Sequence, residues 1–257
     1  MENVVSNEGI GEGSVQPASV SIVVPTYQEA PNLRALLSRI ATTMSSCNSR
    51  YEVIIVDDNS RDGTDEVVET LCGENYPVRL ITRTDERGLS SAVIRGFEES
   101  KGEVLICMDA DLSHQPEAIP QLLECFGDPE VDFALGSRYV PGGSTDDKWG
   151  LARWLNSKLA TLLARPFTHV KDPMSGFFAI RRSVFSEAAA LNPVGYKIAL
   201  ELIVKCKCRK VQEIPIHFVT RQFGQSKLNF TERVNYVKHI KRLAYFKCRE
   251  FVRPGQL

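Results

Sequence analysis

The chain has 257 residues, of which 43% are hydrophobic and 25% are charged, with a formal net charge of −1. That length and composition suit a folded domain built on one hydrophobic core, and the balanced charge excludes a global attraction to nucleic acid. The cysteines number seven and are scattered, which favours reduced thiols over a disulfide framework. No apolar run reaches the ~18–20 residues that a membrane span requires.

The N-terminal segment, residues 1–19, is rich in Ser, Gly, Asn and Glu and lacks the basic start and apolar core of a signal peptide. We interpret it as a disordered arm. One domain is expected over residues 20–228, because no internal repeat or linker divides that stretch. Residues 229–257 then form a separate helical appendage.

Strand and helix patterns alternate from residue 20 onward. Buried-strand patterns occur at 20–24, 52–56, 78–82 and 104–108, and apolar residues at helical spacing follow each of them. This alternation predicts an α/β fold with a mainly parallel central sheet and helices on both faces. Ligands of such a sheet gather beyond the carboxyl ends of the strands.

The second half of the domain continues the same pattern. Helices are expected at 119–126 and about 151–163, a strand is expected at 133–136, and a turn that leads into an apolar strand is expected within 171–180. A late strand is expected over 211–219. The sheet therefore extends well past the fourth strand.

Two carboxylates, Asp109 and Asp111, follow the fourth strand and are separated by one residue. Acids at this spacing can face the same ligand once the chain bends, and a hard divalent cation offsets their repulsion. Taken alone, the pair would be read as two solvated turn aspartates. The residues that follow the other strands favour the metal-binding interpretation.

The first two strands also end in side chains that suit a nucleotide. Tyr27 and Glu29 follow the first strand, and the pair Asp57 and Asp58 follows the second. A nucleotide needs an aromatic wall, acceptors for its base and ribose hydroxyls, and a cation for its diphosphate. Each residue alone is explained as a loop aromatic, a turn or a helix cap. Together with Asp109 and Asp111 they predict a nucleotide-linked donor.

Four cationic residues, Arg138, Arg153, Arg221 and Lys227, fall in loops or at helix ends. A planar guanidinium binds phosphate through two parallel hydrogen bonds. Surface solubility is the simpler explanation for a solitary Arg. Arg221 and Lys227 instead flank Gly224 in a tight loop, which favours a functional role for them.

The last stretch, residues 230–253, has apolar residues on one side of a helical wheel and basic residues on another. A basic amphipathic helix is typical of a membrane surface. A helix that packs on the domain and exposes a solvated basic face has the same pattern. From periodicity alone, both interpretations stay open.

Six motifs occur in order along the chain: VPTYQE at 24–29, VDDNSRDGT at 56–64, DADLSH at 109–114, GSRY at 136–139, DPMSGFF at 172–178 and RQFGQSKL at 221–228. Taken together, they resemble the inverting family-two glycosyltransferases, and within them the enzymes that mannosylate a polyprenyl monophosphate. The resemblance implies a Rossmann-like, GT-A type catalytic domain over 20–228. It also implies transfer of mannose from GDP-mannose to a polyprenyl, dolichyl-type monophosphate, with inversion and with Mg²⁺ or Mn²⁺.

The resemblance also assigns residues to the site. The implied donor-binding set is Pro25, Tyr27, Glu29, Val56, Asp58, Asp109, Ala110, Asp111, Arg221 and Lys227. Asp109 and Asp111 would hold the metal, and the acceptor phosphate would contact Arg138, Arg153 and Ser157. Some relatives carry Gln as a further metal contact where this chain has Ser113, which leaves that contact open.

The implied mechanism needs no general base, because a phosphate monoester is already anionic when it attacks the anomeric carbon. The catalytic residues would be Asp111, Arg221 and Lys227, which together with the metal neutralise the departing diphosphate. His114 is expected to be a structural loop residue.

The family also bears on partners and location. Some relatives carry transmembrane helices after the catalytic domain, and others are tethered by small membrane-anchoring subunits. We expect a peripheral enzyme on the cytoplasmic side of a membrane, the endoplasmic reticulum in a eukaryote or the cell membrane in a prokaryote, with the helix at 229–257 at the membrane surface. Two alternatives stay open: a polyprenyl-phosphate glucosyltransferase that uses UDP-glucose or a related donor, and a non-catalytic subunit that binds nucleotide sugars.

Overall fold

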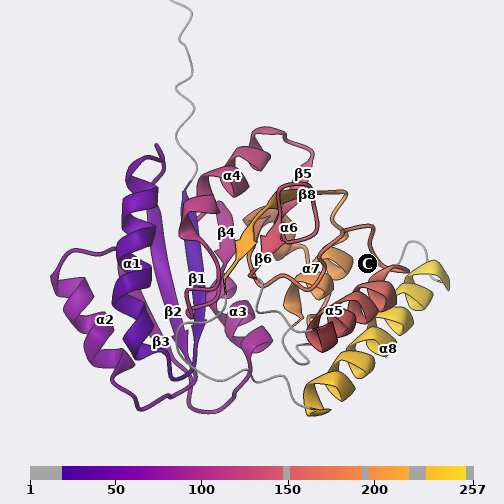
Figure 1. The fold of residues 1–257 in the computed structure, drawn as a ribbon, viewed down its shortest axis with the longest axis horizontal. Helices are drawn as coiled ribbons and strands as arrows, with labels where there is room; N and C mark the ends of the chain where they lie inside the picture. The colour runs from indigo at the N-terminus through magenta and orange to yellow at the C-terminus, as the bar shows by residue number, and fades with distance from the viewer. Residues whose placement is uncertain (1–18, 147–150, 193–196, 220–229, 253–257) are drawn as a thin grey trace, which may run out of the picture.

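The structure is a computed structural model that describes residues 19–146, 151–192, 197–219 and 230–252 (Figure 1). Side chains are described from Lys158 onward in the first helix after position 150, and over 234–249 in the last helix. The arm expected over 1–19 lies outside the described residues except for Ser19. The division into segments at 20–228 and 229–257 therefore stays a prediction.

The first four strands form a parallel half-sheet. They are β1 (Val20–Thr26), β2 (Tyr51–Asp57), β3 (Val78–Thr82) and β4 (Val104–Cys107), and they lie in the order β3-β2-β1-β4. β-branched and other apolar residues make these strands because both faces of the sheet are covered, so alternation with polar residues is not needed. The parallel pairing aligns the carboxyl ends of β1, β2 and β4 along one edge.

The sheet continues through a strand of opposite direction. β7 (Phe178–Arg181) runs antiparallel to both β4 and β5 (Val131–Ser137), and β8 (Lys210–Pro215) runs parallel to β5. The full order is β3-β2-β1-β4-β7-β5-β8. The expected mainly parallel sheet is confirmed.

The late strand expected over 211–219 is two strands. β8 ends at Pro215, and after one residue β9 (His217–Phe218) pairs with β6 (Ser144–Thr145) in a separate two-stranded sheet. The physical reason is Pro215, because proline has no backbone N–H with which to continue a ladder. The chain therefore changes its pairing partner after this residue.

Helices cover both faces of the large sheet (Figure 1). One buried cluster joins α1 (Ala30–Ser45), α2 (Thr64–Gly73) and α4 (Ile119–Glu124) to alternate strand residues. On the other face, α3 (Leu89–Glu98) and α7 (Ile198–Lys205) pack on the intervening residues. Shorter pieces are the 3₁₀ turns η1 (Pro116–Ala118) and η2 (Cys125–Gly127) and the helix α6 (Arg182–Ser186).

Two further helices, α5 (Leu151–Ala164) and α8 (Phe230–Val252), lie side by side at the end of the molecule remote from β3 (Figure 1). A third buried cluster unites them with α7, and the Tyr236 hydroxyl donates a 2.6 Å hydrogen bond to the Ala160 carbonyl oxygen. Leu243 is buried in this cluster, whereas Val237 is exposed, although the helical wheel puts them on one apolar side. One side of α8 therefore packs on the domain, as in the simpler interpretation of its pattern.

A buried polar group secures α8 to α7. The Glu201 carboxylate contacts the Lys205 ammonium at 2.7 Å, and the His239 ring of α8 lies 3.8 Å from the other Glu201 oxygen. His239 is buried, and burial lowers the pKa of its imidazole more than the neighbouring Glu201 raises it, while Lys205 and Arg242 lower it further. The ring is therefore neutral in the folded protein near pH 7.

This environment predicts a loss of stability in acid. In the unfolded chain the His239 imidazole has its ordinary pKa of about 6.5. As the pH falls, the unfolded chain therefore binds this proton at a higher pH than the folded protein does. The stabilising contribution is present above that pH and is lost as the pH falls through the lower pKa of the folded state. Denaturant unfolding at pH 7 and pH 5 should show a smaller pH dependence in His239→Gln than in the wild type. An identical pH dependence in the two proteins would contradict the assignment.

Candidate active site at the carboxyl edge of the sheet

Three adjacent strand ends bring the acidic residues together. Because β1 lies between β2 and β4, the turns after these strands share one edge of the sheet. Pro25 and Val56 are register partners near the ends of β1 and β2, and both are buried. These two residues form the uncharged base of this edge.

The turn after β4 is held by its own side chains. Leu112 has φ +60°, which turns the chain sharply after Asp111. The Asp111 Oδ1 atom accepts hydrogen bonds from the Ser113 backbone N–H at 3.0 Å and from its hydroxyl at 2.5 Å. Asp111 and Ala110 are buried, whereas the Asp109 side chain keeps 23% of its surface exposed. The Asp111 carboxylate is therefore oriented before any ligand arrives.

His114 packs into the acidic turn. Its Nδ1 atom accepts a hydrogen bond from the Asp109 backbone N–H at 3.2 Å, and an Asp109 carboxylate oxygen lies 3.7 Å from the same atom. The ring is buried and stacks on Phe177, with the two centroids 5.4 Å apart.

A glycine allows a second loop to approach Asp109. A Cβ atom at Gly176 would lie 3.2 and 3.3 Å from the Asp109 carboxylate oxygens and 3.3 Å from the His114 ring. The loop over 172–177, which leads into β7, therefore passes directly against the acidic turn. Only a residue without a side chain leaves this space to the carboxylate.

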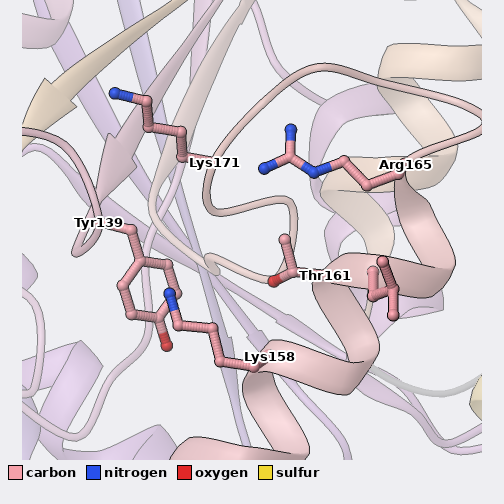
Figure 2. A pocket seen from close by; sticks show the side chains of 6 residues that line it. Tyr139, Lys158, Thr161, Arg165 and Lys171 are labelled. Carbon is pink, nitrogen blue, oxygen red and sulfur yellow. The ribbon is translucent and has the colours of Figure 1, made fainter.

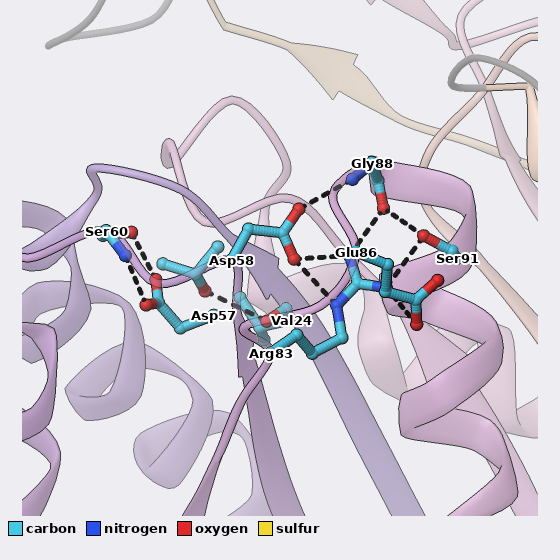
Figure 3. Close-up of polar contacts among 9 residues, drawn as sticks. Val24, Asp57, Asp58, Ser60, Arg83, Glu86, Gly88 and Ser91 are labelled. Atoms are coloured by element: carbon cyan, nitrogen blue, oxygen red, sulfur yellow. Dashed lines mark hydrogen bonds and ion pairs between the residues drawn. The ribbon is translucent and has the colours of Figure 1, made fainter.

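The Asp58 carboxylate is engaged by the loop after β3 (Figure 3). Its Oδ1 atom accepts hydrogen bonds from Arg83 Nε, at 2.7 Å, and from Arg83 Nη2. Its Oδ2 atom accepts a hydrogen bond from the Gly88 N–H at 2.8 Å. Both side chains are buried, and Arg83 also donates to the Ser91 hydroxyl at 2.8 Å. Asp58 thus fixes the segment that carries Arg87, whose guanidinium lies 5.3 Å from the centroid of the Tyr27 ring.

Replacing Asp58 by Asn should separate its structural role from the role in nucleotide binding that the sequence predicts. The change removes the charge that compensates buried Arg83, and we expect a loss of about 3 kcal/mol in the free energy of unfolding, since exposed Glu86 stays beside the guanidinium. Any direct contact with the nucleotide would add a rise in the donor Kd, measured by calorimetry below the melting temperature. Glu86→Gln is the control and should leave both quantities nearly unchanged.

The other residues that the sequence predicts for donor binding lie at the same edge. Glu29 stands at the start of α1, where its carboxylate accepts the Asn32 side-chain amide at 2.6 Å. Asp57 instead accepts the backbone N–H and the hydroxyl of Ser60 and closes the turn after β2. Sequence reasoning missed Arg83 and Arg87. Their position directly after a strand that ends at this edge was the available signal.

The predicted acceptor residue Arg138 follows β5 and pairs with a buried acid. Its Nε and Nη2 atoms donate to the Asp172 carboxylate at 2.7 Å each, and its backbone N–H donates at 3.0 Å. Burial alone would lower the pKa of the Arg138 guanidinium, but the bonded Asp172 and nearby Asp109 outweigh burial and raise it. Arg138 is therefore a fixed cation within electrostatic reach of Asp109.

The remaining predicted residues fall outside the described parts. Positions 153 and 157 belong to α5, but the Arg153 and Ser157 side chains are not described, and Arg221 and Lys227 lie in 220–229. The residue just before that gap is anchored at the site, because the Val219 N–H donates to the Ser113 carbonyl oxygen at 3.1 Å. The roles of these four residues stay predictions.

The carboxylate oxygens of Asp109 and Asp111 suit a hard divalent cation as ligands. Both offer carboxylate oxygens, which Mg²⁺ and Mn²⁺ prefer. Among the described residues no group of three or more His, Cys, Asp or Glu side chains forms a complete metal cage. Mg²⁺ is often held by only one or two carboxylates together with substrate phosphates, so the incomplete cage suits a metal shared with a diphosphate.

The fold and this edge define an α/β domain of the class that binds nucleotide-linked donors at the carboxyl ends of its strands. The family model for glycosyl transferase family 2 matches residues 21–188. The chain belongs to that family.

Curated relatives are similar over most of the chain. The dolichol-phosphate mannosyltransferase of Mycosarcoma maydis is 46% identical, over 89% of this chain and 80% of that protein. The protein of the same name from Saccharomyces cerevisiae is 43% identical, over 88% and 87%. The one from Pyrococcus furiosus is 46% identical over 87% of this chain, which spans 63% of its length.

Solved structures show the same fold. Mannosyl-3-phosphoglycerate synthase from Rubrobacter xylanophilus superposes with a TM-score of 0.67 at 20% identity, over 93% of this chain and 77% of that one. Glucosyl-3-phosphoglycerate synthase from Mycobacterium tuberculosis, solved with Mn²⁺, uridine diphosphate and glucosyl-3-phosphoglycerate, gives 0.64 at 15% identity, over 90% and 80%. The expected GT-A type fold is confirmed.

Proposed function

We propose that the chain transfers mannose from GDP-mannose to a dolichyl-type polyprenyl monophosphate, with inversion at the anomeric carbon. The observation that carries this function is the Asp109 and Asp111 pair at the shared edge of β1, β2 and β4, in a family-2 glycosyl transferase. The choice of mannose and of a dolichyl acceptor rests on the names of the curated relatives.

The donor nucleotide would lie over the ends of β1 and β2. Tyr27 and Arg87 offer an aromatic face and a planar cation, and Glu29 and Asp58 offer carboxylate oxygens. Pro25 and Val56 would form the floor beneath the nucleoside. The network around Asp58 and Arg83 keeps these groups in position before the donor binds, which reduces the ordering cost of binding.

The donor diphosphate would extend toward Asp109, Ala110 and Asp111. When bound there, Mg²⁺ or Mn²⁺ supplies positive charge to the departing nucleoside diphosphate. Ser113 holds the Asp111 carboxylate in one orientation, and Gly176 leaves space beside Asp109. These side chains therefore act by binding and orienting charge. None of them needs to take a proton.

The acceptor phosphate would approach from the side of Arg138, with Arg153 and Ser157 as further contacts. A phosphate monoester is anionic at neutral pH and attacks without a general base, so inversion follows from one in-line displacement. The Arg138 guanidinium, fixed by Asp172, attracts the acceptor while its charge stays in place.

Arg221 and Lys227 would complete the charge around the diphosphate. The described residue nearest to them, Val219, donates a hydrogen bond to the Ser113 carbonyl oxygen. A membrane surface, with or without an anchoring subunit, would present the lipid acceptor. No helix in the described residues is long and apolar enough to cross a bilayer.

The test is transfer from a panel of radiolabelled nucleotide sugars to a short polyprenyl phosphate in detergent. GDP-mannose with Mg²⁺ or Mn²⁺ should give a β-linked lipid-phosphate mannose, and chelation should abolish the product. Preferential turnover of UDP-glucose would establish the glucosyltransferase alternative. If the protein bound GDP-mannose but formed no transfer product with every metal and acceptor tested, the proposal would be overturned in favour of a binding subunit.

A further inference from the structure

A cavity of about 350 Å³ lies between α5 and two loops, one with Tyr139 after β5 and one with Lys171 before β7. Its lining residues are Tyr139, Lys158, Thr161, Leu162, Arg165 and Lys171 (Figure 2). Lys158, Thr161 and Arg165 come from one side of α5 and face Tyr139 and Lys171 across the cavity. None of these side chains has been assigned above to the donor or to the acceptor phosphate.

The cavity is strongly cationic. Three of its lining residues carry a positive charge, and none of the described residues that line it is acidic. Lys158 lies over the Tyr139 ring, 4.5 Å from the centroid, and Arg165 donates to the His169 carbonyl oxygen at 3.1 Å. The described residues provide neither Arg165 nor Lys171 with a carboxylate partner. An anion in the cavity would offset this charge.

The hydroxyl groups at the cavity suit a phosphate in particular. Tyr139 and Thr161 each bring an O–H group beside the cations, and phosphate oxygens accept both neutral and charge-assisted hydrogen bonds. Lys158 and Lys171 offer ammonium groups, and Arg165 offers a planar fork. The chemistry is therefore that of a phosphate ester.

The surface around the cavity indicates that this phosphate belongs to a lipid. Leu162 lines the cavity and is 66% exposed, and on the same helix Leu159 and Leu163 are also exposed. Exposed apolar side chains beside cations form the pattern by which a helix lies in a bilayer interface. A head group in the cavity would leave its acyl chains against these leucines.

The cavity adjoins the predicted acceptor residue Arg138, whose guanidinium lies 5.3 Å from the centroid of the Tyr139 ring. Arg138 does not line the cavity, and its guanidinium is held by the Asp172 carboxylate. Lys158, Thr161 and Arg165 form one stripe of α5, because residues three and four positions apart lie on the same side of a helix. The cations of the cavity are therefore a separate set from Arg138.

We propose that the cavity formed by Tyr139, Lys158, Thr161, Arg165 and Lys171 binds the phosphate head group of an anionic bilayer phospholipid. The bound lipid places α5 at the membrane surface, with Leu159, Leu162 and Leu163 toward the acyl chains. This site is independent of the sugar donor and of turnover, so it stands or falls separately from the proposed function.

Sedimentation of the full chain with vesicles tests the site. Partition onto phosphatidylcholine vesicles that contain phosphatidylserine should fall about 25-fold in Arg165→Gln/Lys171→Gln, because each lost cation costs about fivefold. Partition onto pure phosphatidylcholine should not change. The charge-conserving variant Arg165→Lys/Lys171→Arg should keep most of the binding and controls for folding.

Three results would overturn the proposal. The matched pair on α8, Lys238→Gln/Lys241→Gln, should leave the partition onto anionic vesicles much less changed, and a loss equal to that of Arg165→Gln/Lys171→Gln would show diffuse surface charge instead of a site. Saturable binding of inorganic phosphate by the wild type, with unaltered vesicle binding in the double variant, would show a site for soluble phosphate. A raised KM for polyprenyl phosphate in detergent, again with unaltered vesicle binding, would make the cavity part of the acceptor site.

Discussion

Replacement of Asp111 by Asn is expected to lower kcat/KM for sugar transfer by about three orders of magnitude, the upper range for loss of one preorganised electrostatic group. The Asn side-chain oxygen can still accept both Ser113 hydrogen bonds, so the turn should keep its shape while one negative charge disappears. Initial rates with GDP-mannose, a polyprenyl phosphate and increasing Mn²⁺ measure the effect. Partial recovery at high Mn²⁺ should follow if the lost function is metal binding.

The control for this variant is Ser113→Ala. It keeps both carboxylates but removes the hydroxyl that orients Asp111, so a smaller loss of roughly tenfold is expected from one hydrogen bond. The unfolding midpoints of both variants should lie near that of the wild type. An Asp111→Asn enzyme with wild-type kcat/KM would eliminate the assigned role of this carboxylate.

Replacement of Asp172 by Ala should have the largest effect on stability. Asp172 is fully buried and accepts hydrogen bonds from the guanidinium and the backbone N–H of Arg138. Its loss would leave the buried Arg138 charge without a partner carboxylate. Breaking such a pair costs about 3–5 kcal/mol, which for a domain of this size corresponds to a fall of roughly 10 °C in the melting temperature.

The double variant Arg138→Met/Asp172→Leu separates charge from packing. With both charges replaced by apolar groups, much of the stability should return, because no buried ion is left alone. Transfer to the polyprenyl phosphate should remain impaired, since the cation near Asp109 is gone. If the single Asp172→Ala variant melts with the wild type, the pair does not carry the stability assigned to it.

The edge of the sheet was predictable because parallel strands impose it. Asp58, Asp109 and Asp111 each follow an apolar run, and once those runs are parallel strands their ends must meet. What periodicity could not reveal was which charges neutralise one another. Arg83 is separated from Asp58 by a helix and a strand, and only the folded chain brings the two side chains together.

Two helical features escaped the sequence for related reasons. Every residue of α7 is buried, including Glu201 and Lys205, so the helix has no polar face to produce an amphipathic period. In α8, Leu243 is buried while Val237 and Tyr245 are exposed, so its contacts do not follow the simple apolar stripe. Tertiary partners, which the local pattern does not contain, decide both cases.

The antiparallel strand β7 has a consequence for how the site is assembled. Among the described strands of the large sheet, β7 alone joins β4, which leads into the acidic turn, to β5, which Arg138 follows. Because β7 runs in the opposite direction, the loop that enters it delivers Asp172 and Gly176 to the same edge. A nascent chain that stops before Phe178 already contains both acids and the arginine but has no strand to hold them in one sheet. The acidic turn and Arg138 are therefore joined in one sheet only after this late segment has been made.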